Sequence, residues 1–151
     1  MRMIDLHRCN RGAEIAEMAL LLPLLCFICF GIIEVSSFVR VHQVINNAAR
    51  EGARLSSLPE NLPSNSNPDP TPQIKAAVAT YAQQNGLSTF SAGNVAIDQN
   101  QIITTASGEN FFASRVTVTF PYSVLYIPGM IYSTMPGTVN LKATAEFRNF
   151  Q

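Results

Sequence analysis

The chain has 151 residues, a formal net charge of zero and a charged fraction of only 13%. This length accommodates one modest domain plus one membrane anchor, and the low charge excludes bulk electrostatic attraction to nucleic acid or to acidic substrates. The three cysteines all precede residue 30, so a head stapled by disulfides is excluded as well.

An uncharged apolar run extends from Met18 to Ile33, directly after Glu17. This run would form a helix of about 24 Å, which is shorter than the roughly 30 Å of hydrocarbon in a bilayer. Extending the helix to Val39 supplies the missing length but places Glu34 within the outer part of the span. No small-residue cleavage site follows the run, so we expect an uncleaved anchor and not a secretory signal peptide.

Two cysteines and a proline lie within the run. Cys26 and Cys29 have C-x-x-C spacing, but no histidine or carboxylate lies close to them in the sequence. Such thiols on an apolar helix are typical of small side chains that face lipid or another helix, so we assign them no redox or metal chemistry. Pro23 removes one main-chain hydrogen bond and predicts a kink, which a membrane helix tolerates when it packs against other helices.

The helical pattern continues beyond the membrane segment. Residues recur at alternating intervals of three and four, which is the 3.5-residue period of a helix that packs along a partner. This seam comprises Gly31, Glu34, Phe38, Val41, Ile45, Ala48, Gly52 and Leu55. For residues 41–55 two interpretations stay open: the seam receives another subunit, or it receives the chain's own head. For Gly31, Glu34 and Phe38 we expect an intermolecular partner, because too little of the head is available at that depth.

A stretch rich in Pro, Asn and Ser, residues 58–72, ends the long helix. Pro72 then opens a second helix over residues 73–85, and Gly86 closes it as its C-cap. One apolar stripe marks the buried face of this helix. The stripe consists of Ile74, Ala77, Val78, Tyr81 and Ala82.

Strand patterns fill the rest of the head. Residues 95–97 and 102–105 are predicted to form a hairpin around Asp98-Gln99-Asn100-Gln101, and alternating apolar and polar residues predict strands at 116–120 and 141–148. We therefore expect an antiparallel sheet with one polar face, packed on the helices. The apolar connection at residues 125–135 either tucks under the head or forms an exposed contact patch for another component.

The head offers no catalytic constellation. Histidine occurs only at His7 and His42, so residues 56–151 contain neither His nor Cys. The acidic residues of the head fall on loops or strand surfaces without a motif, and an isolated carboxylate is not an acid–base site. We expect a protein that is not an enzyme and has no cofactor and no metal.

The start of the chain resembles the cleavage site of type IV pilin-like proteins, in which a glycine precedes the cut and a glutamate is the fifth residue after it. Here the matching residues are Gly12-Ala13-Glu14-Ile15-Ala16-Glu17. Joined to the Pro-interrupted run and to the block Ala48-Ala49-Arg50-Glu51-Gly52-Ala53-Arg54, they make the chain similar to the TadE-like minor pseudopilins of Tad/Flp (type IVc) pili. The resemblance covers residues 11–55, with a weaker echo at 141–148.

The resemblance implies that a prepilin peptidase cuts between Gly12 and Ala13. It also implies that Glu17 pairs with the freed amine of a neighbouring subunit, whereas the plainer interpretation has Glu17 reaching headgroup water. An amine and a carboxylate in low dielectric offset each other's desolvation only when they are paired. Glu34 either reaches outward to the interface or pairs with a basic group on another subunit. Met18 departs from the aromatic residue that the major pilins prefer.

We therefore expect an α+β chain, with a long transmembrane helix continuing outside the membrane and a head of one helix on an antiparallel sheet. The expected parts are a leader at 1–12, the helix at 13–55, a linker at 56–72 and the head at 73–151. The arginines of the leader place the N-terminus in the cytoplasm and everything after Arg40 across the membrane. The resemblance implies that this membrane is a bacterial inner membrane and that the head lies in the periplasm.

The resemblance implies a structural minor pseudopilin that takes part in initiation or at the tip of a Tad-type adhesive pilus, with entry into the extracellular pilus left open. Its implied partners are other minor pseudopilins, the major Flp-type pilin, prepilin peptidase, the inner-membrane pilus platform and the lipid bilayer, with no nucleic acid. The alternative is an uncleaved, signal-anchored periplasmic binding module.

Overall fold

A computed structural model describes residues 10–62, 69–104, 108–123 and 138–149. Two α-helices and a three-stranded sheet make up these residues. The helices are α1 (Asn10–Ser56) and α2 (Thr71–Gln84), and single turns of 3-10 helix form η2 (Pro59–Asn61) and η3 (Ala92–Asn94). The strands are β1 (Val95–Thr104), β2 (Asn110–Ser123) and β3 (Thr138–Arg148). The expected α+β class, with a long N-terminal helix and a small head, is confirmed.

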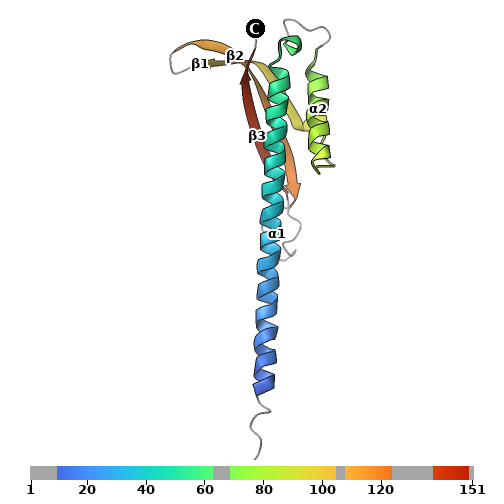
Figure 1. Cartoon of the computed structure of the whole chain (residues 1–151), viewed down its shortest axis with the longest axis vertical. Coiled ribbons are helices and arrows are strands. Elements are labelled where there is room, and N and C mark those ends of the chain that lie inside the picture. Colours follow the sequence, from blue (N-terminus) through green and yellow to red (C-terminus); the bar gives the residue numbers. More distant parts are fainter. Residues whose placement is uncertain (1–9, 63–68, 105–107, 124–137, 150–151) are drawn as a thin grey trace, which may run out of the picture.

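Helix α1 determines the shape of the molecule. Its lower part projects free of the head, while its upper part lies against α2 and the sheet (Figure 1). Pro23 lies inside α1, which continues without interruption from Asn10 to Ser56, so this residue does not end the helix. The ribbon of α1 is continuous along its whole length (Figure 1). The leucine-rich sequence around Pro23 has high helix propensity, which supports continuation on both sides.

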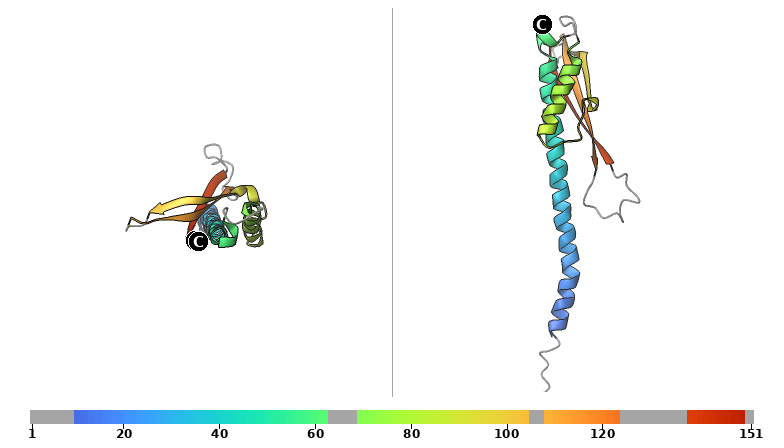
Figure 2. Two further views of the ribbon diagram at one scale, coloured as in Figure 1. Left: turned by 90° about the horizontal axis from the view of Figure 1, so that it is seen from above. Right: turned by 90° about the vertical axis from the view of Figure 1, so that its right-hand side faces the viewer.

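The sheet is an antiparallel meander in the order β1-β2-β3. Both helices cover one of its faces, as the side view shows (Figure 2). Side chains of β2 alternate between the two faces, so Val116, Val118 and Phe120 are buried, whereas Thr117 and Thr119 lie on the outer face. The expected sheet with one polar face is therefore confirmed.

The hairpin expected within residues 95–105 was wrong. These residues form the single strand β1, which pairs along its length with β2 and has an irregularity between Asp98 and Gln101. The turn-like sequence Asp-Gln-Asn-Gln is absorbed as a bulge, because one inserted residue kinks a strand without reversing it. Asp98 stabilises the bulge locally, accepting hydrogen bonds from the Asn100 main chain and from the Gln101 side chain.

The second helix begins and ends where the sequence placed it, to within two residues. Pro72 lies in the first turn, and Gly86, with φ of 97°, adopts the left-handed conformation that ends a helix most cheaply at glycine. The buried face contains Ile74, Val78, Ala79 and Ala82. The prediction that Ala77 faces the core was wrong, since Ala77 is exposed and Ala79 takes its place.

The core lies between α1, α2 and the sheet. Small residues on α1 allow the other elements to approach its backbone: a Cβ on Gly52 would lie 2.7 Å from Val78 Cγ2 and 3.1 Å from Val116 Cγ1. Larger side chains from the other elements fill the remaining space. The fully enclosed members of the core are Ile45, Ala48, Ala49, Ala53, Val78, Ala82, Val116 and Val118.

Two expectations concern residues outside the described ranges. The apolar connection at 125–135 lies wholly among them, so its two interpretations stay open. Within the linker expected at 56–72, the described part contains η2, and α1 itself ends at Ser56. The boundaries proposed for the four parts of the chain stay predictions.

Candidate functional site

The lower part of α1 is exposed around its whole circumference. Every side chain from Gly12 to Ile33 is solvent-accessible in the isolated chain, and large apolar residues dominate this stretch. A soluble monomer rarely exposes so continuous an apolar surface. Its largest members are Ile15, Met18, Leu20, Leu21, Leu22, Leu24, Leu25, Phe27, Ile28, Phe30, Ile32 and Ile33.

The residues predicted for processing lie at the beginning of this exposed surface. Gly12 and Ala13 belong to the first turn of α1, and a Cβ on Gly12 would meet no atom within 4 Å. Glu14 and Glu17 are both exposed on the same stretch of helix. The candidate processing site and the candidate pairing carboxylate are thus accessible to another protein.

Glu34 ends this exposed stretch, because only 8% of it is exposed. Tyr122, the penultimate residue of β2, donates a hydrogen bond from its Oη to Glu34 Oε1 at 2.7 Å. Phe38 completes the junction: its ring meets the Tyr122 ring edge to face, with centroids 5.7 Å apart, and stacks on His42. The head therefore covers Glu34 with its own tyrosine.

The structure corrects the expectation that too little of the head reaches this depth. The paired ends of β2 and β3 descend along α1 far enough for Tyr122 to contact residues 34 and 38 (Figure 1). Sequence reasoning missed Tyr122, although the alternation of Val116, Val118 and Phe120 continues to it and places it on the helix-facing side. Whether Glu34 also meets another subunit stays a prediction.

The outer half of the seam faces the chain's own head. Ile45, Ala48 and Gly52 are buried against α2 and the sheet, and Val41 and Leu55 pack at the edge of the same core. Of the two interpretations left open for residues 41–55, the intramolecular one is correct for these residues. Gly31, by contrast, is exposed, and its partner stays a prediction.

A buried polar network holds the upper end of α1. The main-chain oxygen of Ser56 accepts a hydrogen bond from Gln99 Nε2 at 3.0 Å, and Ser114 Oγ lies 3.1 Å from it. Gln99 Nε2 also donates to the main-chain oxygen of Asn61, while Asn149 Nδ2 donates to that of Gln99. The last carbonyls of a helix have no partner within it, so the β1 bulge, which carries Gln99, serves as a cap.

Little in the described residues resembles a catalytic or metal site. Among them, no group of three or more His, Cys, Asp or Glu side chains is arranged to hold a metal ion. Cys26 and Cys29 are both exposed on α1.

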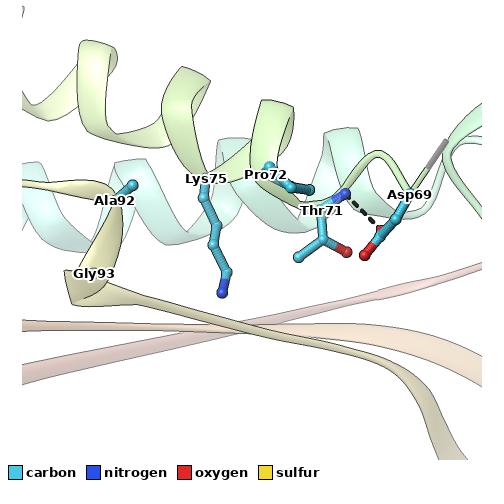
Figure 3. Close-up of a pocket in the computed structure, with 6 residues that line it drawn as sticks. All are labelled: Asp69, Thr71, Pro72, Lys75, Ala92 and Gly93. Carbon is cyan, nitrogen blue, oxygen red and sulfur yellow. Dashed lines mark hydrogen bonds between the residues drawn. The ribbon is translucent and has the colours of Figure 1, made fainter.

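A hollow of about 480 Å³ lies between the start of α2 and η3. Its lining includes Asp69 and Lys75, but Asp69 Oδ1 accepts a hydrogen bond from the Thr71 main chain (Figure 3). Hydrogen bonds from the side chain and the backbone of Thr71 hold the pKa of Asp69 below its usual value. The carboxylate is therefore used in the turn that begins α2.

These features define a class of protein: a chain with one exposed apolar helix carrying a small α+β head. Within the described residues, α1 is the one helix long and apolar enough to cross a membrane. Residues 12–54 match the model of a family described as TadE-like protein. The helical part of the chain is therefore TadE-like, which associates the protein with the structural components of the Tad pilus.

The family match covers α1 almost to its end and stops before the head. Comparison with curated proteins and with solved structures gave no match.

Proposed function

We propose that the protein is a minor pseudopilin that helps to initiate or cap a Tad-type pilus. One observation carries this proposal: the head leaves the first half of the TadE-like segment, residues 12–33, uncovered. A helix exposed on all sides over residues 12–33 can meet lipid and the helices of other subunits, whereas its upper part is already occupied. Assembly then proceeds through contacts of the lower part of α1.

Processing precedes assembly in this proposal. Prepilin peptidase cuts between Gly12 and Ala13 and frees an amine at the start of the helix. Glu17 of one subunit then pairs with that amine on a neighbour, and the pair fixes the register of the two helices, because each charge in low dielectric requires the other. The bilayer of the inner membrane holds the subunit until it joins its partners.

Mass spectrometry tests the processing step. The full chain is expressed with a prepilin peptidase, extracted from membranes and measured intact, and the product is expected to begin at Ala13. A Gly12→Leu variant supplies the matched control and is expected to retain its first 12 residues. A wild-type chain that keeps its leader under these conditions contradicts the proposal and favours the uncleaved, signal-anchored binding module.

Co-purification tests the pairing step. Glu17→Ala is expected to lower the recovery of partner pseudopilins with the tagged chain, while membrane insertion is retained. Glu14→Ala is the control, since Glu14 is an equally exposed carboxylate one turn earlier on the same helix. Equal partner recovery for the two variants argues against a specific role of Glu17.

A further inference from the structure

The lower end of the sheet lies beside the apolar part of α1. Tyr122 of β2 contacts Glu34 and Phe38, and both of these residues precede Arg40, the first exposed charge after the apolar run. Both strand ends run alongside the middle of α1 in two views (Figures 1 and 2). The head thus contacts the last apolar turn of α1, on the N-terminal side of Arg40.

This end of the sheet contains no charge in its described residues. Residues 120–123 of β2 and 138–141 of β3 are apolar or neutral, and Val139, the cross-strand partner of Tyr122, is 45% exposed. The opposite end of the sheet is different. It carries Asp98, Glu109, Arg115, Glu146 and Arg148.

The hydrogen bond to Glu34 changes the length of the apolar surface on α1. With Glu34 covered by Tyr122, no exposed charge interrupts residues 18–39. These residues span about 33 Å, close to the roughly 30 Å of hydrocarbon, whereas the run ending at Ile33 is too short. The covered carboxylate therefore removes the mismatch that the sequence presents.

The depth of the sheet end in the bilayer follows from which residues of α1 form the membrane span. Glu34 precedes Val39 by five residues, so the Tyr122 contact lies about 7–8 Å on the membrane side of Val39. If the span instead ends at Ile33, the contact lies at the boundary itself. Whether the span ends at Val39 or at Ile33, the end of the β2–β3 pair reaches the bilayer. Tyrosine is typical of the interface between membrane and water.

We infer that the end of the β2–β3 pair, defined by Tyr122, Ser123, Thr138 and Val139, contacts the phospholipid bilayer that α1 spans. The protein meets the membrane through two elements, and the second fixes the tilt and rotation of the head above it. The inference depends on α1 crossing a membrane, but not on peptidase cleavage or pilus assembly.

Tryptophan fluorescence tests this contact, because the chain contains no tryptophan. Three single-tryptophan variants of the full chain are reconstituted into phosphatidylcholine vesicles with or without brominated acyl chains. Val139→Trp reports on the proposed contact. Ile28→Trp is the positive control in the middle of the apolar run, and Ile102→Trp is the matched control, an exposed apolar strand residue at the other end of the sheet.

The expected result is that Val139→Trp and Ile28→Trp lose most of their emission to brominated lipid, while Ile102→Trp keeps it. The bromines nearest the headgroups should quench Val139→Trp most. Circular dichroism checks that each variant retains its strands, and Ser123→Trp replaces Val139→Trp if that variant does not fold.

Two outcomes overturn the inference. If only Ile28→Trp is quenched, α1 crosses the membrane but the head does not touch the lipid. A blue-shifted emission of Val139→Trp in that case shows that protein covers the end of the sheet. Absence of quenching for Ile28→Trp removes the membrane span itself, and with it both the contact and the proposed anchoring. Failure of cleavage or of partner recovery leaves this result unaffected.

Discussion

The lower and upper parts of α1 differ in a way that hydrophobicity alone does not explain. The lower part, over residues 12–33, carries large Leu, Ile and Phe side chains and buries none of them, whereas the upper part buries Ala48, Ala49 and Ala53 completely. Small residues let the backbones of α2 and the sheet approach, and large ones project toward whatever surrounds the helix. Side-chain size, more than apolar character, distinguishes the helix face that receives the head from the surface that stays exposed.

The largest loss of stability is expected from truncating a buried core residue on the upper part of α1. Ile45→Ala leaves a cavity at a site with no exposed surface and should lower the free energy of unfolding of the head by about 2–5 kcal/mol. Ile32→Ala, on the exposed lower part, should leave it unchanged. Urea unfolding in mild detergent, followed by near-ultraviolet circular dichroism, measures both. Equal losses for the two variants would contradict the division of α1 into two parts.

A buried hydrogen bond between Tyr122 and Glu34 lies at the junction between the two parts. Tyr122→Phe removes a donor to Glu34 and should cost about 1–3 kcal/mol, since a buried hydrogen bond is lost. Glu34→Gln retains an acceptor for the tyrosine hydroxyl and should cost less. Hydrogen exchange of the β2–β3 end, compared between the two variants, separates loss of the hydrogen bond from replacement of the carboxyl group. If both variants behave like the wild type, the junction does not hold the head in place.

Two glycines of α1, one in each part, differ in the space around their backbone. Gly52→Ala brings a Cβ against Val78 and Val116 and should cost about 1–3 kcal/mol of overpacking, offset by about 1 kcal/mol of improved helix propensity. Gly31→Ala meets no atom within 4 Å and gains the propensity alone. The thermal midpoint of the head should therefore fall for the first variant and not for the second. A rise for both would show that the core accommodates the methyl group.

The smallest effect concerns an exposed ion pair on the upper part. The hydrogen bond from Arg54 holds the pKa of Glu51 below its ordinary value of 4.5. A lowered carboxyl pKa contributes stability at pH values above the unfolded pKa, and this contribution is lost as the pH falls through the folded pKa. On acidification below about pH 5, the wild type should thus lose slightly more stability than Glu51→Gln. The difference between the two proteins should be small, because the ion pair is exposed. Urea midpoints measured across that pH range test the difference.

Local sequence rules predicted much of the head. Pro72 and Gly86 marked the second helix to within two residues, and the alternation at 116–120 and 141–148 marked two strands correctly. The bulge in β1 escaped these rules, since Asp98-Gln99-Asn100-Gln101 has the composition of a turn. Gln99 is needed in the strand because its amide reaches the end of α1, more than 40 residues earlier in the chain. No local pattern contains that information.

The candidate site divides in the same way. The sequence by itself determined the apolar run, the candidate processing residues Gly12 and Ala13 and the TadE-like resemblance, because length, charge and spacing are local properties. Only the tertiary structure decided that the chain's own head fills the outer seam and that Tyr122 covers Glu34. Residues 88 positions apart meet there because an antiparallel pair of strands runs back along the helix, and a contact of that range depends on the packing of the whole head.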